Sequence, residues 1–430
     1  MAIHLCYDSS MIITYQYRIK PSAEQVAILD NWMELLRRHW NYALGKRLDW
    51  LNSTRCQINC CSIIKEPIGE VREKVDYYTQ QAELKETKKL FPEYKEIYTE
   101  VQQLNLERLD KAWKRWLIPD KSGKRGGRPK FKKHSELRSI SFSRVNHSKA
   151  ACFLEGDILR IPRLGIFPVV LHRPIADSFV LKTANIVKKA DGWYVCISAK
   201  DDTVPTPTST PTVKTTVGVD VGLKEFLTTS TGETVAVPQF YRKAQNHLAR
   251  QQRFLSRQEK GSNSYKRQQN RIARIHQHIQ RQRKDFHYKT AQKLVRNYDL
   301  ISVEDLQVKN LARNSKLAKS ILDAAWSQFI NILESVAVKC GVHVVKVNPH
   351  NTSQNCSGCG VKVPKTLSVR THSCPKCNST LDRDENAAIN ILNKALQAVG
   401  HIVSAGQGQE VIQPVKPEAW GFSGMQLSLF

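Results

Sequence analysis

Residues 217–224 read V-G-V-D-V-G-L-K, which predicts a short apolar strand over Val217–Val221 with a single acid, Asp220, inside it. A carboxylate charge within a buried strand is costly unless the group is paired or binds a metal ion. Asp220 is therefore the first candidate for a residue that does chemistry rather than packing.

The segments around this strand predict an ordered succession of elements. A hairpin over Phe226–Thr229 and Val235–Val237 follows it. Then come a buried strand at Leu300–Val303, a helix over roughly 320–340, a further strand at His343–Val347 and a last helix that begins near Asp384. Antiparallel strands followed by strands that alternate with helices is the order that an RNase H-like fold requires. Many other α/β folds alternate in the same way, so this order alone does not decide between them.

Two further acids occupy positions comparable to that of Asp220. Glu304 ends the apolar run L-I-S-V-E, and Asp384 lies in D-R-D-E-N-A-A-I-N-I-L, where the last helix begins. Taken singly, Glu304 is explained as a strand-end residue and Asp384 as an acid favoured by the helix dipole. Taken together, three converging carboxylates can hold two Mg²⁺ ions that clamp the attacking and leaving oxygens of a phosphodiester, and hydrolysis would leave a 5′-phosphate and a 3′-hydroxyl. The competing acids are Asp382, Asp305 and Glu225, and Asp384 ranks above Asp382 because it directly precedes the helix.

Four of the eleven cysteines form two C-x-x-C pairs separated by fourteen residues, Cys356/Cys359 and Cys374/Cys377. This spacing predicts one structural Zn²⁺ ion held by four thiolates, with no position left open for a substrate. A redox role for one pair, or His372 as a replacement ligand, is a weaker alternative. The other seven cysteines are scattered, which favours a reducing, cytoplasmic compartment over a disulfide framework.

The chain has 430 residues and a formal net charge of +27, which predicts a polyanionic partner such as nucleic acid. Residues 240–296 are predicted to be helical and carry sixteen lysines and arginines against Glu259 and Asp285. The loop P-D-K-S-G-K-R-G-G-R-P-K, residues 119–130, is basic and rich in glycine. The predicted nucleic-acid contacts are Arg125, Arg128, Lys130, Lys132, Arg250, Arg253, Arg257, Arg271 and Arg274. A solvated surface or a plain linker would explain the same charges.

The first two hundred residues predict a different architecture. Alternating apolar residues indicate a strand over 12–19, and Ser22 and Gln25 have the spacing of a capping box at the start of a long helix. Residues 70–117 look helical, and residues 139–200 read as short strands of a small β domain. The stretch from Asp201 to Pro211 is rich in threonine and proline and reads as a linker. No run of about eighteen apolar residues and no secretory signal are found, so neither a membrane partner nor export is expected.

Taken together, these motifs resemble the TnpB (OrfB) family of transposon-encoded endonucleases and the related type V CRISPR effectors. The matching residues are V-G-V-D-V-G-L-K at 217–224, S-V-E-D-L at 302–306, T-S-Q-N-C-S-G-C-G at 352–360, C-P-K-C at 374–377 and D-R-D-E-N-A-A-I-N-I at 382–391, with G-R-P-K-F-K at 127–132 also similar. They cover most of residues 217–397, whereas the N-terminal half matches mainly in architecture.

The resemblance implies a multidomain α+β fold: a small β-barrel-like wedge domain with an inserted helical domain, then an RNase H-like (RuvC) α/β domain with an inserted zinc ribbon. The implied segments are a first wedge strand (1–20), a helical recognition domain (21–118), the β wedge domain (119–200), a linker (201–215), the first part of the nuclease core (216–350, with the basic insert 240–296), the zinc ribbon (351–380), the last core helix (381–400) and a disordered tail (401–430). It also implies catalytic roles for Asp220, Glu304 and Asp384. A guide RNA from the transposon end would read the target DNA by base pairing, while the protein reads a short adjacent motif.

The chain ends in Q-L-S-L-F, residues 426–430, which is similar to the peptide by which bacterial enzymes dock on the DNA sliding clamp. Leu427, Leu429 and Phe430 would be apolar anchors, and Gln426 would add a hydrogen bond. Chance, or a tail that packs back on the protein, is the alternative.

Three functions therefore compete: an RNA-guided, Mg²⁺-dependent DNA endonuclease, a transposase that performs strand transfer with the same acids, and a regulator of transposition that binds DNA or RNA without cutting. The three acids argue against the regulator. Guide dependence, which would separate the endonuclease from the other two, is not readable from the sequence.

Overall fold

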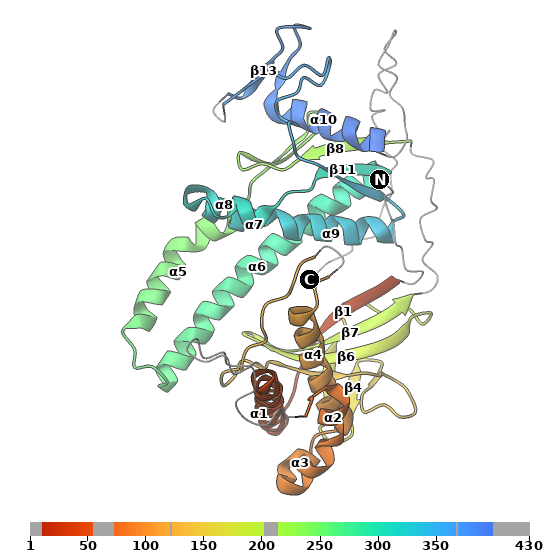
Figure 1. The fold of residues 1–430 in the computed structure, drawn as a ribbon, viewed down its shortest axis with the longest axis vertical. Coiled ribbons are helices and arrows are strands. Elements are labelled where there is room, and N and C mark those ends of the chain that lie inside the picture. The colour runs from red at the N-terminus through yellow and green to blue at the C-terminus, as the bar shows by residue number, and fades with distance from the viewer. Residues whose placement is uncertain (1–10, 55–72, 121–122, 202–213, 367–368, 399–430) are drawn as a thin grey trace, which may run out of the picture. The chain divides into compact units, whose positions relative to one another are not determined.

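The computed structural model describes residues 11–54, 73–120, 123–201, 214–366 and 369–398, which fall into two compact units, 1–203 and 204–430 (Figure 1). The predicted linker from 202 onward and the C-terminal tail lie outside the described residues. None of the described helices combines the length and the apolar character needed to cross a bilayer.

The first unit contains a seven-stranded sheet in the order β2-β6-β7-β1-β5-β4-β3. The strands are β1 (Met11–Ile19), β2 (Ser139–Phe142), β3 (Phe153–Glu155), β4 (Ile158–Ile161), β5 (Gly165–Val170), β6 (Val180–Lys189) and β7 (Gly192–Asp201). The alternation expected over 12–19 is confirmed: every second residue from Ile13 to Ile19 is buried or half-buried, and the residues that alternate with them are exposed. The strand therefore presents one face to the core and the other to water.

The predicted barrel-like closure is wrong, because the sheet is open among the described strands. Its two edges, β2 and β3, do not pair with each other. β1 pairs with β7 along its whole length but with β5 only at Arg18 and Ile19. The meander β5-β4-β3 therefore diverges from the rest of the sheet and does not return to β2.

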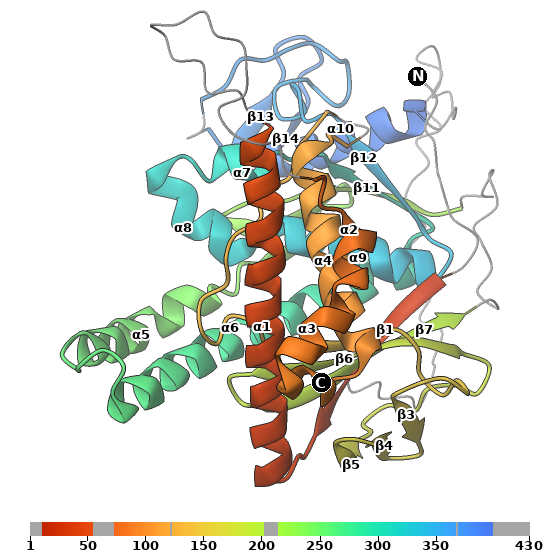
Figure 2. The same ribbon diagram turned by 60° about the horizontal axis from the view of Figure 1, so that its bottom comes forward.

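Helices α1 (Ala23–Ser53), α2 (Tyr77–Ala82), α3 (Leu84–Leu90) and α4 (Thr99–Leu117), with the short helix Pro92–Lys95, complete this unit (Figure 2). The predicted capping box at the start of α1 is confirmed: Ser22 Oγ accepts from the Gln25 amide, and the Gln25 side chain accepts from the Ser22 amide. The predicted helical region over 70–117 is broken before Pro92, whose ring prevents the preceding turn from continuing. The buried ion pair Arg47–Asp110, at 3.0 Å, joins α1 to α4.

The second unit is built on a five-stranded sheet in the order β10-β9-β8-β11-β12. Its strands are β8 (Thr216–Asp220), β9 (Glu225–Thr229), β10 (Thr234–Ala236), β11 (Leu300–Glu304) and β12 (His343–Val347). β8, β9 and β10 are antiparallel neighbours, whereas β8, β11 and β12 run parallel. The order of antiparallel strands followed by alternating strands and helices is therefore the one predicted.

Helices cover both faces of this sheet. The helices are α5 (Phe240–Ser256), α6 (Asn263–Asn297), α7 (Val308–Leu311), α8 (Ser315–Ala324), α9 (Trp326–Lys339) and α10 (Arg383–Ala398). Val217 and Val219 of β8 join the core beneath α6 and α9, while the alternate residue Gly218 faces α10. The single helix expected over 320–340 is two helices, because Ala325 adopts a left-handed conformation with φ of 53°.

Candidate functional site

Two of the three predicted acids meet at one edge of the five-stranded sheet. Asp220 and Glu304 are the last residues of β8 and β11, and these strands run parallel with Val219 paired to Val303. The carboxyl ends of parallel strands lie at the same sheet edge, so pairing of the apolar residues places the two acids side by side. Glu304 is buried and Asp220 is half-buried.

Helix α10 brings the third acid, Asp384, to this edge, and Gly218 is the reason that the helix can approach so closely. A Cβ atom added to Gly218 would lie only 1.9 Å from the backbone oxygen of Ala388. The glycine therefore lets the backbones of α10 and β8 touch. Asp384 is the second residue of α10, and its charge is felt at Asp220.

The acids repel one another in the absence of a cation. Burial raises the pKa of Asp220 well above its ordinary value, and the charges of Glu304 and Asp384 raise it further, while Arg383 opposes the shift. Burial also raises the pKa of Glu304, and a hydrogen bond from Thr352 and the charge of Lys394 oppose that shift. A divalent cation beside these confined carboxylates would offset their repulsion and replace the missing hydration.

Asp384 is at present neutralised by arginine. Arg383 lies 3.0 Å and Arg370 lies 3.5 Å from its carboxylate oxygens. The competing acids are placed differently: Asp382 and Asp305 are exposed, and Asp382 accepts a hydrogen bond from the Asp384 amide. Glu225 is half-buried at the start of β9, which is antiparallel to β8 and therefore begins at the same sheet edge, beyond Asp220. The donor types fit Mg²⁺, although loading would require Asp384 to turn away from the two arginines.

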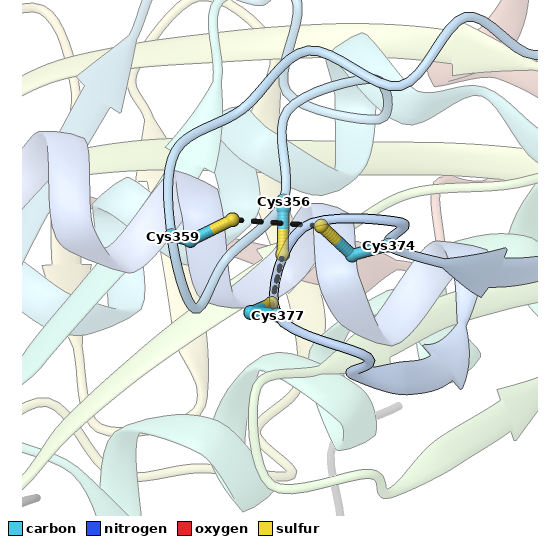
Figure 3. A group of neighbouring side chains, drawn as sticks. All are labelled: Cys356, Cys359, Cys374 and Cys377. Carbon is cyan, nitrogen blue, oxygen red and sulfur yellow. Dashed lines mark hydrogen bonds between the residues drawn. The ribbon is translucent and has the colours of Figure 1, made fainter.

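The four predicted zinc cysteines lie together in the second unit, with their sulfur atoms pointing at one another (Figure 3). The sulfurs lie within 4.8 Å of one another, and the pairs Cys356–Cys377 and Cys359–Cys374 are 3.5 Å apart. Zn–S bonds of about 2.3 Å place tetrahedral sulfurs about 3.8 Å apart, so this geometry suits zinc. Within the described part of the chain, no other group of three or more metal-ligating side chains is assembled in this way.

His372, the alternative zinc ligand, is not a member of this group. It is fully buried in β13 (Thr371–Ser373), which pairs with β14 (Thr380–Asp382), and its Nδ1 faces the Lys365 ammonium. The amides of Cys377 and Lys376 donate to the Cys374 sulfur and lower its pKa to about 6. That hydrogen-bond pattern stabilises a thiolate, which is the form that binds zinc.

The basic hairpin, α5 with α6, presents the predicted contact residues to solvent. Arg250, Arg253 and Arg257 of its first arm, and Arg271 and Arg274 of its second, are all exposed. A buried carboxylate anchors its base: Asp323 accepts from the amides of Tyr241 and Arg242 and pairs with Arg283 at 3.2 Å.

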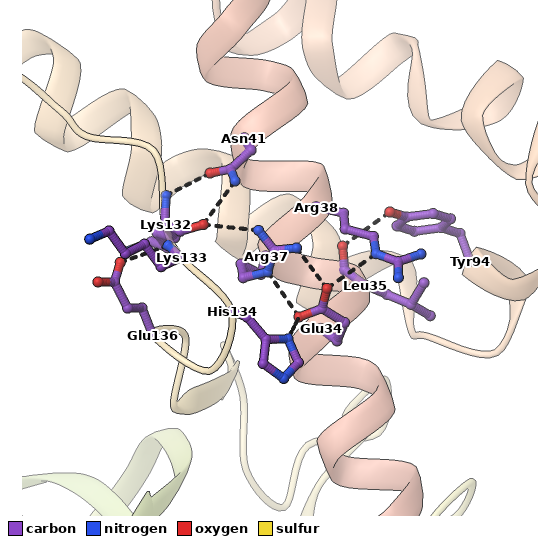
Figure 4. Close-up of polar contacts among 10 residues, drawn as sticks. All are labelled: Glu34, Leu35, Arg37, Arg38, Asn41, Tyr94, Lys132, Lys133, His134 and Glu136. Atoms are coloured by element: carbon purple, nitrogen blue, oxygen red, sulfur yellow. Dashed lines mark hydrogen bonds and ion pairs between the residues drawn. The ribbon is translucent and has the colours of Figure 1, made fainter. Parts of the chain in front are cut away.

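The second basic element, the loop 123–133 of the first unit, is held against α1 through its backbone (Figure 4). Asn41 donates to the Lys132 carbonyl at 2.9 Å and accepts from the Lys132 amide at 2.8 Å, and Arg37 also donates to that carbonyl. Arg37 in turn holds Glu34 and, as the main cause, lowers the pKa of Glu34 to about 2. The loop is thus fixed by its main chain, which leaves side chains available for a ligand.

The side chains of this loop differ in their availability. Arg125, Arg128 and Lys130 are exposed, whereas Lys132 is half-buried with its ammonium 4.3 Å from the Trp40 ring centre. Burial, together with the Arg108 charge, lowers the pKa of Lys132. Phe131, which a count of charges overlooks, is 54% exposed among these cations. Single-stranded nucleic acids bind to such combinations of cations and aromatic rings.

Two residues that shape the acid site were missed by the sequence analysis. Gly218 lies in the quoted V-G-V-D motif, but only its packing against α10 reveals its role. Thr352 lies in the quoted T-S-Q-N-C motif and donates to the Glu304 carboxylate at 2.5 Å. The predicted clamp-docking residues Gln426, Leu427, Leu429 and Phe430 lie outside the described residues.

Comparison with known proteins gives three family matches along the chain. Residues 196–315 match a probable transposase family, OrfB of IS605, and residues 326–391 match the TNB domain of Cas12f1-like proteins. Residues 11–56 match a helix-turn-helix domain, although residues 11–53 here form β1 and the single long helix α1.

Similar sequences extend over most of the chain. A Streptomyces pristinaespiralis protein named "Putative RNA-guided DNA endonuclease" is 30% identical over 391 residues, which is 89% of each chain. An Escherichia coli K12 protein named "Putative RNA-guided DNA endonuclease InsQ" is 29% identical, and the match covers 74% of this chain and 78% of that protein. A solved structure, the Cas12f1–sgRNA–target DNA complex, aligns with a TM-score of 0.46 and 12% identity over 90% of this chain and 99% of that one. Because of the 30% identity to the Streptomyces protein over most of both chains, together with the family matches, the chain belongs to the TnpB (OrfB) family.

Proposed function

We propose that this protein is an RNA-guided, Mg²⁺-dependent DNA endonuclease that cuts target DNA at an RNase H-like (RuvC-type) site. The observation that carries the proposal is the gathering of Asp220, Glu304 and Asp384 at one sheet edge, where their mutual repulsion calls for cations. The names of the relatives, which describe RNA-guided DNA endonucleases, support the choice of substrate and guide.

Each acid has a defined task in this proposal. Two Mg²⁺ ions at the site would supply charge neutralisation at the scissile phosphate and activation of a water molecule. Asp220 and Glu304, fixed at the ends of two parallel strands, would hold the cations against a rigid sheet edge. Asp384, carried by α10, would exchange its arginine partners for a cation. Cleavage in line would leave a 5′-phosphate and a 3′-hydroxyl.

The nucleic acid would be held by the two basic elements. The exposed arginines of the basic hairpin and the loop 123–133 offer positive charge to phosphates without reading sequence, as expected for contacts to a guide RNA or to a guide–target duplex. The four cysteines would hold one structural Zn²⁺ ion, which keeps the segment between β12 and α10 folded. We further propose the segments inferred from the sequence, from a wedge domain with its inserted helical recognition domain to the zinc ribbon, as the functional divisions of the chain.

The decisive test is cleavage of a plasmid library in the presence of Mg²⁺ by protein co-expressed with its own transposon-end region, beside Asp220→Ala. We expect double-strand cuts at guide-matched sites next to a short fixed motif, and none with the variant. RNA that co-purifies without cutting would favour a regulator of transposition. Absence of any bound RNA would make strand transfer the next assay.

Docking of residues 426–430 on the DNA sliding clamp is a separate proposal, based on the sequence alone. Deleting these five residues should abolish binding to purified clamp and leave cleavage intact. If the truncated and the full-length chains bind the clamp equally well, the clamp-docking proposal is wrong.

A further inference from the structure

Helix α10 carries a polar ladder on one side, formed by Asn386, Asn390 and Lys394 at spacings of four residues. Side chains four apart lie on the same face of a helix. All three donate hydrogen bonds to backbone oxygens of one segment, residues 348–355, which leads from β12 into the first cysteine pair. The same helix carries Asp384 in its first turn.

The first rung of this ladder fixes the segment directly beside a zinc cysteine. Asn386 is fully buried, donates to the Asn355 carbonyl at 2.8 Å and accepts from the Ser357 amide at 2.9 Å. An amide side chain that binds the main chain through both its oxygen and its nitrogen defines position and orientation together. Cys356 lies between the two anchored residues.

The second and third rungs hold the part of the segment that faces the acid site. Asn390 donates to the Thr352 carbonyl at 2.8 Å and again to Asn355 at 2.7 Å. Lys394 donates to the His350 carbonyl at 2.6 Å and to Asn348 at 3.2 Å. The backbone of Thr352 is therefore fixed on both sides.

Thr352 passes this placement on to Glu304. Its side chain is buried, and its hydroxyl lies 2.5 Å from Glu304 Oε1 and 3.0 Å from the Pro349 carbonyl. A hydroxyl has one proton to donate, and the ionised carboxylate is the stronger acceptor. The bond engages one carboxylate oxygen and defines the direction in which the other points.

We propose that Thr352 is a positioning residue for the metal-binding carboxylate Glu304, and that the ladder of α10 places Thr352. One helix would then supply Asp384 from its first turn and orient Glu304 from its side. The inference rests on the proposed function only in taking Glu304 as a cation ligand. It assigns a role in the acid site to Thr352, Asn386, Asn390 and Lys394, none of which is expected to touch substrate.

The test measures Mn²⁺ binding to the zinc-loaded full-length protein by electron paramagnetic resonance of the free ion, without added DNA. The quantity compared is the Mn²⁺ binding that is present in the wild-type protein and lost in Asp220→Asn. Mn²⁺ held by any bound RNA is the same in both proteins and is removed by this subtraction. Thr352→Val keeps the side-chain shape and removes the donor, whereas Thr352→Ser keeps the donor. Asn390→Ala removes a rung, and Asn393→Ala is the matched control on the same helix outside the ladder.

We expect Thr352→Val to weaken this binding by about 10- to 100-fold, the usual effect of removing a residue that orients a metal ligand. Thr352→Ser should restore it to within about threefold, with zinc content unchanged throughout. Asn390→Ala should weaken it in the same direction and add nothing to Thr352→Val, because both act through one hydroxyl. Asn393→Ala should match wild type.

Two results would overturn the proposal: wild-type binding by Thr352→Val, or equal losses with valine and serine, which would indicate packing rather than hydrogen bonding. Failure of the proposed function gives a different pattern. If wild-type protein binds Mn²⁺ through Asp220 but never cuts DNA, the endonuclease is rejected while the positioning role stands. If no binding depends on Asp220, both are rejected.

Discussion

The second unit contains two candidate metal sites, and they are assembled in opposite ways. The four cysteines come from residues 356–377, and their sulfurs lie within 4.8 Å of one another. The three acids come from positions 220, 304 and 384, and burial together with the charges of the other two raises the pKa of Asp220. The cysteines are close in the sequence and their sulfurs already lie together. The acids are far apart in the sequence, and their proximity depends on strand pairing and on the close approach of a helix.

This difference predicts opposite energetic consequences. Ligands collected by two short turns are held otherwise only by a few contacts, such as those of Asn386 and the short β13–β14 ladder, so the metal itself supplies much of the folding free energy. Acids held in place by a packed sheet destabilise the protein until a cation arrives, because the scaffold rather than the ion positions them. Variants at each site should therefore change stability in opposite directions.

The largest effect should come from the cysteines. Cys356→Ser, at a buried sulfur, should abolish zinc binding and unfold residues 351–382 locally, because free energies of zinc binding in such sites are about 10 kcal/mol or more. Zinc content and limited proteolysis would measure both results. Cys340→Ser, at an exposed cysteine outside the group, should change neither. Full zinc content in Cys356→Ser would mean that the site is not a four-thiolate one.

The next largest effect should come from Gly218→Ala. The added methyl group would lie 1.9 Å from the Ala388 backbone oxygen, so α10 must move away from β8 and take Asp384 with it. We expect a loss of about 3 kcal/mol in unfolding free energy, at the upper end for overpacked sites, and loss of cleavage.

Gly45→Ala is the control for this substitution. Gly45 lies within α1, and a Cβ added there meets nothing within 4 Å. Alanine should stabilise the helix by about 0.5–1 kcal/mol. Chemical denaturation measures both variants, and a neutral Gly218→Ala would show that α10 does not depend on this contact.

Asp220→Asn should abolish cleavage and yet raise the melting temperature of the metal-free protein at pH 7. Burial, with the neighbouring acids, raises the folded-state pKa of Asp220 above its unfolded value, so ionising it costs stability, and that stability is lost as pH rises through the folded-state pKa. A gain of about 1 kcal/mol corresponds to roughly 2–4 °C for a unit of this size. The gain should disappear below about pH 4, where aspartate is protonated in both states. A lower melting temperature at pH 7 would contradict it.

The contrast between the two sites also explains what could be predicted from the sequence. The C-x-x-C spacing specifies a site within a few turns of chain, and the strand ends at Asp220 and Glu304 follow from apolar runs that stop at an acid. The capping box at Ser22 is equally local. Each of these signals lies within one short stretch of chain.

The features that escaped prediction depend on contacts between distant segments. Thr352 and Glu304 are 48 positions apart, and no periodicity relates them. The break at Ala325 lacks a glycine or proline to mark it, and the open sheet follows from the short register between β1 and β5. The ladder alone left a trace, since Asn386, Asn390 and Lys394 recur at four-residue spacing along one face of α10.

The smallest effect should come from residues that belong to no assembled site. Arg271 of the basic hairpin is exposed, so Arg271→Gln should leave the melting temperature unchanged. If its charge neutralises one phosphate, the slope of log affinity against log salt for a labelled transcript of the transposon end should become shallower by about 1. Glu259→Gln, which removes an exposed acid between the two helices, is the matched control and should leave that slope unchanged or make it steeper. If the slope for Arg271→Gln is unaltered, the hairpin at this position is a solvated surface. Removing a charge that contacts RNA would leave one more counterion condensed on the RNA in the complex and would therefore change the slope.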